Sequence, residues 1–448
     1  MVEKAHRKDW DWDYHKSIQQ KCVAPWHSLT IQWDGAVYAD AISRIEYGSL
    51  YDKTLSELWQ SDTAVKLRKS WADGKPDPEI CYNCIKKEKT VGNSRRKYFY
   101  RNISPQLLRT ATYDINAEPD IWYLEINSSN KCNLKCRMCG GEVSSTWIKE
   151  EKQLNALSPE WMPFRKEGKY HRVEFDAVKN ILEKKEYFEN LEFLKFAGGE
   201  PLMEDQNYQI MEQFIEWGIS KNIVLDINTN GTMLNPRLFN IAKNFKKVKF
   251  HISIEGTGKL YQYIRGGDNF TIEQLEANIK EFNKLENTQI IYTVTVQVYN
   301  IYDITNIWKW YKKIRKPGDE IFFTNVVVYP RYLNMHILSP TMKWYAYKMM
   351  KDADLPIGDF KLPGENAGQG DPGFSNLMKN LYGKHDFMEV QERKKYLREF
   401  IQFTKSVDKI RNTDVMEVVP QLKSLFEERV DIASEDKWSE IYENEFKE

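Results

Sequence analysis

Between residues 121 and 329 the sequence alternates short β-rich runs with amphipathic helical stretches. This order is typical of consecutive βαβ units, which build a parallel sheet covered by helices. Helical stretches at 205–218, 236–245 and 272–285 favour crossover connections over an antiparallel sheet. The predicted strands are 121–128, 191–197, 222–228, 248–255, 289–298 and 320–329. Six strands predict an α/β fold built on a partial (β/α)6 barrel, two strands short of a closed one.

Several of these strands alternate apolar and polar residues, with Leu225 and Ile227 on one face and Asp226 on the other. A packed barrel would be filled with Val, Ile and Leu, so the alternation indicates a polar cavity, although an antiparallel sheet with one wet face would share it. The predicted inward residues are Tyr123, Glu125, Asn127, Asp226, Asn228, Asn230, His251, Ser253, Glu255, Thr293, Thr295 and Gln297. His251 is either a general base or, the favoured interpretation, a hydrogen-bonded inward histidine.

Three of the six cysteines, Cys132, Cys136 and Cys139, form a C-x3-C-x2-C run directly after the first predicted strand. This position places them at the carboxyl end of the barrel, where active sites on such folds assemble. Iron-sulfur cubanes are usually held by four cysteines, so three would leave one iron open. A zinc site would need a second ligand pair at familiar spacing, and none follows nearby. Six cysteines in 448 residues are too sparse for a disulfide framework.

The cysteine run resembles the signature of the radical S-adenosylmethionine (radical SAM) superfamily, and Gly198-Gly199-Glu200-Pro201 resembles its GGEP motif. The resemblance implies a [4Fe-4S] cluster on the three cysteines, with S-adenosylmethionine on the open iron and its amino group at the GGEP motif. By order along the chain it also implies cofactor contacts at the barrel mouth. These are Met138 by its backbone and Gln297-Val298 at the adenine, Asn228, Ser253 and Glu255 at the ribose and carboxylate, and Arg265 at the carboxylate.

A second cysteine set precedes the barrel. Cys22-Val23-Ala24-Pro25-Trp26, an Asp34-Gly35 turn and Cys81-Tyr82-Asn83-Cys84 resemble, in order, the auxiliary-cluster modules called SPASM and twitch. The resemblance implies an auxiliary iron-sulfur cluster on Cys22, Cys81 and Cys84. That group usually has a cysteine pair shortly after the turn, whereas this chain has Asp40. The fourth ligand is therefore Asp40, another donor, a substrate or water, and a degenerate module or a zinc knuckle stays open.

The chain divides into a predicted N-terminal tail at 1–19, a twitch-like domain at 20–115, a barrel at 116–330 and a mostly helical extension at 331–448. Residues 368–373 fit G-x-G-x-x-G, but no strand precedes them, so the segment 363–373 is predicted to be a loop. Lys plus Arg and Asp plus Glu both number 65, which gives no footprint for nucleic acid. The N-terminus is charged and no apolar run is long enough to span a bilayer, so we expect a cytoplasmic protein without a membrane partner.

The resemblance implies an enzyme that cleaves S-adenosylmethionine reductively and uses the 5′-deoxyadenosyl radical to abstract hydrogen. The expected substrate is a peptide or protein, and the expected partner is a reductant such as flavodoxin or ferredoxin. One alternative is a radical dehydrogenase of small alcohols such as aminocyclitols. The other is a non-catalytic protein, either a zinc scaffold or an iron-sulfur sensor.

Overall fold

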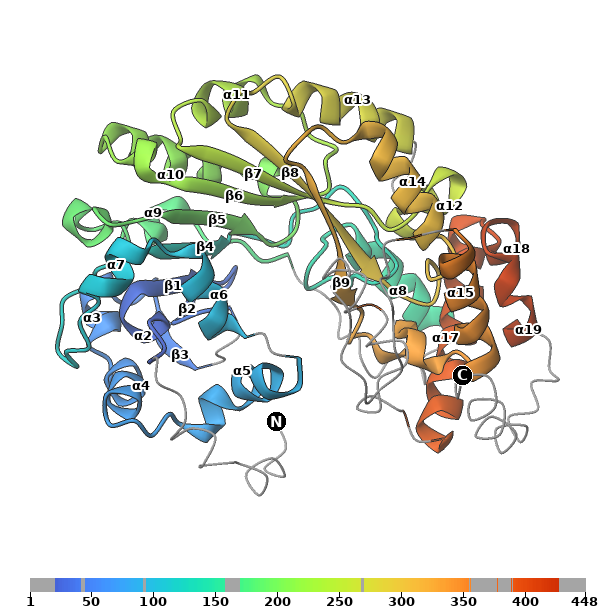
Figure 1. The fold of residues 1–448 in the computed structure, drawn as a ribbon, viewed down its shortest axis with the longest axis horizontal. Coiled ribbons are helices and arrows are strands. Elements are labelled where there is room, and N and C mark those ends of the chain that lie inside the picture. Colours follow the sequence, from blue (N-terminus) through green and yellow to red (C-terminus); the bar gives the residue numbers. More distant parts are fainter. Residues whose placement is uncertain are drawn as a thin grey trace.

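The computed structural model describes residues 21–41, 45–91, 94–157, 170–266, 270–353 and 390–426, with the single residues Leu355, Leu377 and Met388. The predicted tail at 1–19 and the predicted loop at 363–373 lie outside these ranges. Within them, nine strands form one sheet in the order β3-β2-β1-β4-β5-β6-β7-β8-β9 (Figure 1). None of the helices in this part of the chain is long and apolar enough to cross a membrane.

The six strands of the barrel run parallel to one another, which confirms the crossover topology. They are β4 (Tyr123–Asn127), β5 (Phe193–Ala197), β6 (Val224–Thr229), β7 (Lys247–Ser253), β8 (Thr288–Val296) and β9 (Glu320–Val326). The described sheet ends at β9 and does not close on itself. The structure therefore confirms a partial barrel.

Helices cover the convex outer face of this sheet (Figure 1). They include α9 (Phe175–Val178), α10 (Asp205–Glu216), α11 (Pro236–Ala242), α12 (Gly258–Arg265), α13 (Ile272–Phe282) and α14 (Ile304–Ile314). Helix α13 begins at a capping box, in which the Thr271 side chain accepts from Gln274 N and the Gln274 side chain accepts from Thr271 N. On α14, Ile304, Ile307 and Tyr311 are buried at helical spacing, so one apolar face meets the sheet.

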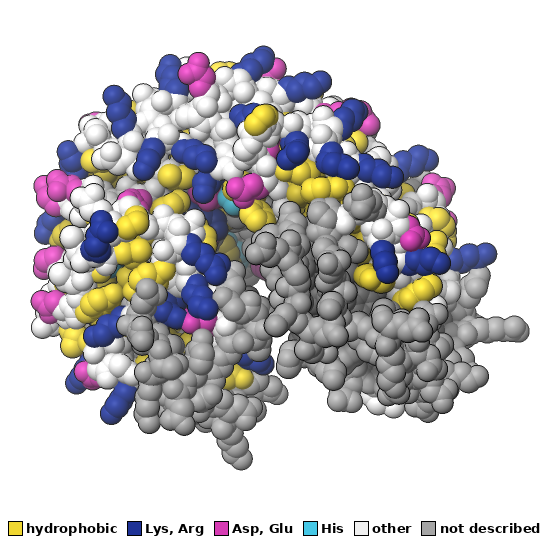
Figure 2. Space-filling view, in the orientation of Figure 1, with side chains coloured by type: hydrophobic (Ala, Val, Ile, Leu, Met, Phe, Trp, Pro, Cys, Tyr) yellow, Lys and Arg dark blue, Asp and Glu magenta, His cyan; other side chains and the backbone are white. Residues whose placement is uncertain are grey.

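The inner face of the barrel is polar and more exposed than the outer face. Along β7, Val248, Phe250 and Ile252 are buried, whereas Lys249 and His251 are partly exposed. The period of two therefore separates the faces as predicted. Histidine and acidic side chains are visible in the hollow that the arc of the molecule encloses (Figure 2).

The N-terminal segment continues the barrel sheet. Strands β1 (Ser28–Ile31), β2 (Ala36–Tyr38) and β3 (Glu46–Ser49) form an antiparallel meander, and β1 pairs in parallel with β4. The sheet thus crosses the predicted boundary at residues 115 and 116 without interruption. Around the meander lie α2 (Ala24–His27), α3 (Leu55–Trp59), α4 (Asp62–Ala72), α5 (Pro78–Val91), α6 (Arg95–Asn102) and α7 (Pro105–Thr110).

Beyond β9 the described chain is helical. It contains α15 (Pro340–Asp352), α17 (Val390–Arg411), α18 (Val415–Val418) and α19 (Lys423–Phe426). Helix α17 packs against α8 (Trp147–Leu157), which follows the cysteine loop, and α18 packs against α12. Short 3-10 turns occupy Lys185–Phe188, Pro201–Met203, Ser220–Asn222, Arg331–Leu333, Met335–Ile337 and Pro420–Leu422.

Candidate active site

The three barrel cysteines converge on the loop that leaves the carboxyl end of β4. Cys132 and Cys136 are buried, Cys139 is partly buried, and all three are free thiols. A hydrogen bond between the side chains of Cys136 and Cys139 lowers the pKa of Cys136 and raises that of Cys139, and the charge of Cys136 acts on Cys132. Burial raises the pKa of Cys132 to about 12. The loop thus brings together three thiols that sequence spacing alone had grouped.

Gly198 and Gly199 hold the start of this loop. Gly199 N donates to Ser129 O at 2.9 Å, and Glu200 N donates to Lys131 O at 2.7 Å. A Cβ on Gly199 would lie 2.2 Å from Lys131 O, and one on Gly198, which has a φ of +114°, would lie 2.7 Å from Ser129 O. The glycines were expected to let the backbone approach a ligand. In the structure they let it approach the cysteine loop, because main chain meets main chain there.

The Glu200 carboxylate is buried and already bonded within the chain. It accepts hydrogen bonds from Thr229 Oγ1 at 2.8 Å, Asn230 N at 2.7 Å and Leu202 N at 3.1 Å. Burial raises the pKa of Glu200, and these three donors oppose that shift. A carboxylate has about four acceptor positions, so there is room for a further donor. The predicted contact with the cofactor's amino group stays a prediction.

Asn230 reaches the cysteine loop, which sequence reasoning missed. Its Nδ2 lies 3.7 Å from Cys132 Sγ and 2.8 Å from Asn133 Oδ1, and its Oδ1 accepts from Thr232 N at 2.9 Å. The signal was present, because Asn230 had been placed on the inner face just beyond the third strand. Asn228, the predicted cofactor contact, is partly exposed on β6 beside His251 of β7.

A buried ion pair lies next to the thiols. Arg265 Nη1 is 2.8 Å from Glu255 Oε2, and both side chains are nearly inaccessible. Burial works to lower the pKa of Arg265, but the charges of Cys136 and Glu255 raise it well above its usual value. Arg265 Nε is buried without a hydrogen-bond partner among the described residues. An unpartnered cationic N–H beside three thiols fits an anionic group at this position.

Met138 and Gln297 meet at the mouth, while Val298 does not. Gln297 Nε2 lies 3.9 Å from Met138 Sδ, and Gln297 Oε1 is buried without a partner in the described part of the chain. Val298 belongs to the apolar core, and its N–H donates to Leu333 O at 3.0 Å. The predicted contact of Val298 with the cofactor is therefore wrong for its side chain and N–H. Gln297 presents the unpartnered acceptor instead.

Ser253 and its neighbour on β8 stand on the same row of the inner face. Ser253 pairs in register with Thr293, and both side chains are partly exposed. Its predicted contact with the cofactor's ribose or carboxylate stays a prediction.

Below the mouth, charged side chains form one row across the inner face. The register aligns Glu125, Lys195, Asp226 and Lys249 on successive strands. Lys195 Nζ is 3.5 Å from Glu125 Oε1, and Arg95 Nη2 of α6 is 3.1 Å from Glu125 Oε2. The row is therefore ionic, with cations from both the barrel and the N-terminal segment.

His251 stands one row nearer the mouth. Its Nε2 lies 3.2 Å from the Asp226 carboxylate, which confirms a hydrogen-bonded inward histidine. Burial alone would raise the pKa of Asp226, but His251, Lys195 and Lys249 together lower it. Asp226 thus orients the imidazole toward the interior, the arrangement that a proton-transfer residue requires.

The second cysteine set also comes together. Cys22, Cys81, Cys84 and Asp40 line one cavity, although they come from the residue before α2, from α5 and from the segment after β2. Burial raises the pKa of Cys22, Cys81 and Cys84. The predicted fourth donor, Asp40, therefore lies where the prediction requires it. Arg95 and Arg96 line the same cavity.

In the ranges that the structure describes, no three His, Cys, Asp or Glu side chains stand in an arrangement that could hold a metal ion. The individual ligands of the clusters therefore stay predictions. The chemistry of the donors is nevertheless suitable, since thiolates are the usual ligands of iron-sulfur clusters. Arg265 supplies the compensating charge at the barrel loop.

Comparison with known proteins agrees with this geometry. Residues 126–306 match the radical SAM superfamily, and residues 22–85 match the SPASM iron-sulfur cluster-binding domain. Curated proteins give no match. Each matched segment contains one of the two cysteine sets.

Three solved structures illustrate the similar folds. The enzyme anSMEcpe with bound AdoMet and Kp18Cys peptide is 16% identical, with 64% of this chain and 60% of that chain covered and a TM-score of 0.31. SuiB of Streptococcus suis bound to the precursor peptide SuiA is 17% identical, with 61% and 59% covered and a TM-score of 0.34. TYW1 with a lysine-pyruvate adduct is 15% identical, with 50% and 69% covered and a TM-score of 0.28. The chain thus spans about 60% of the length of anSMEcpe and SuiB.

The radical SAM domain implies a [4Fe-4S] cluster and S-adenosylmethionine, and the SPASM domain implies auxiliary iron-sulfur binding. The two matches also confirm the predicted order, with the auxiliary module before the barrel. The chain therefore belongs to the radical SAM superfamily and carries a SPASM iron-sulfur domain on the N-terminal side of its radical SAM domain.

Proposed function

We propose that this protein is a radical SAM enzyme that modifies a peptide or protein within its open barrel. The observation that carries the proposal is the convergence of three thiols with the unpartnered Arg265 Nε at the mouth of a polar cavity. When bound, the cluster and S-adenosylmethionine supply a 5′-deoxyadenosyl radical by one-electron cleavage of the bond between sulfur and carbon. The protein positions the reactants and excludes water.

The residues at the mouth have separate roles in this proposal. Cys132, Cys136 and Cys139 hold the cluster, and Arg265 compensates the negative charge that their thiolates bring. Glu200 joins the end of β5 to the end of β6 through its three hydrogen bonds. Gln297 Oε1 offers an acceptor for an exocyclic amino group at the adenine position.

The interior determines what kind of substrate can enter. The row of Glu125, Lys195, Asp226 and Lys249 favours a substrate with ionic or strongly polar groups. His251, oriented by Asp226, is the candidate for removing a proton after hydrogen abstraction. A small aminocyclitol satisfies this chemistry as well as a polar peptide side chain does.

The mouth favours the longer substrate. Val328 and Tyr329, which follow β9 at the open side of the barrel, are 74% and 56% exposed. Large exposed apolar side chains next to a polar cavity suit a ligand that extends beyond the cavity. A peptide can contact both surfaces at once, whereas a compact sugar alcohol would reach only the interior. We therefore favour a peptide.

The first experiment asks whether the radical chemistry occurs. After anaerobic reconstitution we expect about four irons per chain, or up to about eight with an auxiliary cluster, and release of 5′-deoxyadenosine that depends on dithionite, flavodoxin or ferredoxin. Cys136→Ala should abolish this release, and Cys84→Ala should retain the iron of the barrel site. Binding of zinc alone, or cleavage that survives Cys136→Ala, would refute the proposal.

The second experiment identifies the substrate class. Peptide pools and aminocyclitols are incubated separately with the reconstituted protein, and 5′-deoxyadenosine is compared with the rate without substrate. We expect stimulation and a mass change with peptides. Stimulation by aminocyclitols alone would assign the alternative dehydrogenase activity, and Val328→Ser with Tyr329→Ser should then have no effect on it.

A further inference from the structure

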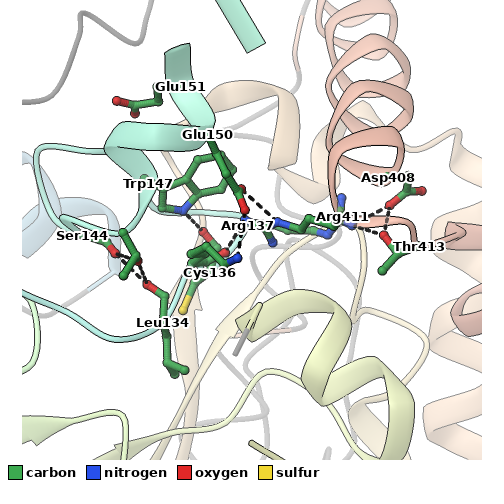
Figure 3. Close-up of polar contacts among 12 residues, drawn as sticks. Leu134, Cys136, Arg137, Ser144, Trp147, Glu150, Glu151, Asp408, Arg411 and Thr413 are labelled. Atoms are coloured by element: carbon green, nitrogen blue, oxygen red, sulfur yellow. Dashed lines mark hydrogen bonds and ion pairs between the residues drawn. The ribbon is translucent and has the colours of Figure 1, made fainter. Parts of the chain in front are cut away.

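The end of helix α17 contacts the cysteine loop, far from it in sequence. Arg137, between Cys136 and Cys139, is completely buried. Its Nη2 is 2.5 Å from Asp408 Oδ1 and 3.1 Å from Thr413 Oγ1, and its Nε donates to Tyr263 O at 2.9 Å (Figure 3). The side chain inside the cysteine motif is thus held partly by residues near the C-terminal end of the described chain.

A second arginine on α17 holds the main chain of the same loop. Arg411 Nη2 donates to Lys135 O at 2.7 Å and to Glu150 Oε2 at 2.8 Å. Trp147 Nε1 donates to Cys136 O at 2.8 Å, and the Arg411 guanidinium lies 4.7 Å from the centre of the Trp147 ring (Figure 3). Three consecutive loop residues, at positions 135, 136 and 137, are therefore fixed from α8 and α17.

Packing shows that α17 is an integral part of the structure. Phe400, Phe403 and Val407 are fully buried, and Phe403 stacks against Trp147 with ring centres 6.3 Å apart. Thr404 Oγ1 lies 2.7 Å from Tyr299 Oη, at the end of the barrel sheet. The helix thus joins the barrel and the cysteine loop, although it lies outside the matched segment 126–306.

The contacts also bring charge to the cluster loop. Arg137 and Arg411 lie beside the loop, in addition to Arg265, whose charge acts on Cys136. The charge of Arg411 also reaches Cys136 and lowers its pKa, after the larger effects of the bond to Cys139, burial and Arg265. Net charge and hydrogen bonding near a cluster are among the factors that set its reduction potential. Positive charge stabilises the reduced cluster, which is more negative.

We propose that the end of α17, from Asp408 to Thr413, is a working part of the cluster site. It positions Cys136 through Arg137 and Lys135, and the charge of Arg411 raises the reduction potential of the cluster. The residues are positioning residues, because they act through the loop and not on substrate. The inference rests on the cluster that the radical SAM domain implies and is independent of the substrate proposed above.

Two variants with matched controls test it. Asp408→Asn removes one acid of the contact, and Glu392→Gln removes an acid from the start of the same helix, where its partner is the exposed Arg331. Arg411→Gln removes one cation of the contact, and Lys409→Gln removes an exposed cation two residues away. Each pair changes the net charge equally, so only location differs.

Three readouts are independent of turnover. They are the rate of iron loss to a chelator, the midpoint potential of the cluster from EPR-monitored titration, and amide hydrogen exchange of residues 132–139 in the iron-free protein. We expect Asp408→Asn and Arg411→Gln to lose iron about 10-fold faster, as for other changes behind metal ligands, and to exchange the loop faster. Arg411→Gln should also move the midpoint potential to a more negative value, and both controls should match the parent protein.

The outcomes separate the two parts of the inference. Unchanged iron loss and loop exchange in both variants would refute the positioning role. An unchanged potential in Arg411→Gln would refute the tuning role. If Asp408→Asn fails to fold, Thr413→Val replaces it, because this variant removes one hydrogen bond to Arg137 at constant charge and similar volume. Failure of the proposed function through lack of any substrate would leave all three readouts measurable.

Discussion

Gly199→Ala tests whether the cysteine loop rests on the Gly-Gly segment. The added Cβ would lie 2.2 Å from Lys131 O, and ordinary van der Waals contact begins at 3.4 Å, so the two segments must separate by 1.2 Å (3.4 − 2.2). The bond from Glu200 N to Lys131 O would lengthen from 2.7 to 3.9 Å, and that from Gly199 N to Ser129 O from 2.9 to 4.1 Å. Both hydrogen bonds would be lost.

The energetic cost follows from this separation. Two buried hydrogen bonds contribute about 1 kcal/mol each, and forcing a methyl group into a packed interior costs about 1–3 kcal/mol. The sum, about 3–5 kcal/mol, should lower the apparent melting temperature of the iron-free protein by at least about 5 °C. Because Lys131 directly precedes Cys132, reconstituted iron should also fall.

Gly218→Ala is the control for this substitution. Gly218 has a φ of +74° and no atom within 4 Å of the added Cβ, so it tests backbone strain without a clash, at a cost of about 1–2 kcal/mol. Differential scanning fluorimetry and iron determination should show a small loss of stability and normal iron. Equal melting temperatures and iron contents in the two variants would show that the Gly-Gly segment does not support the loop.

Three further predictions concern other parts of the chain. Cys81→Ala with Cys84→Ala should remove up to about four irons per chain and leave the barrel cluster; unchanged iron, measured colorimetrically, would mean that the N-terminal cavity is empty. Burial lowers the pKa of His336 to about 3, so its contribution to stability is complete above its unfolded pKa of about 6.5 and is lost as pH falls. Chemical denaturation between pH 6.5 and 5 should therefore show about 1.4 kcal/mol per pH unit more loss in the parent than in His336→Gln. Asp226→Asn should lower modification of substrate about 10-fold while release of 5′-deoxyadenosine without substrate stays the same; a parallel loss of both would place Asp226 in a structural role.

The barrel could be predicted because its signal is local. A strand between two environments repeats every two residues, and the helices between the strands repeat every 3.6. The partial exposure of Lys249 and His251 against the burial of Val248 and Phe250 is therefore already written in the sequence of β7. The cysteine motif was equally local, since a loop of eight residues contains all three thiols.

The remaining features depend on which distant segments meet. Ser28–Ile31 is a run of four residues, and nothing in it specifies parallel pairing with β4. The reason for Gly199 lies in Lys131, and the partners of Arg137 lie on α17. Sequence reasoning identified such residues by type or by motif. It could not give the reason for their positions, because each reason is a tertiary contact.

The pairing of β1 with β4 has a consequence for how the two cysteine sets are related. Arg95 lines the cavity of Cys22, Cys81 and Cys84, and its guanidinium also pairs with Glu125 on the inner face of β4. A linker between separate domains would leave the two sites free to move apart. Here a ladder of backbone hydrogen bonds joins their supporting strands, and a slip of one residue would turn Glu125 away from the interior. The separation between the auxiliary cavity and the barrel interior is therefore fixed by strand register, so Arg95→Gln should disturb both sites together.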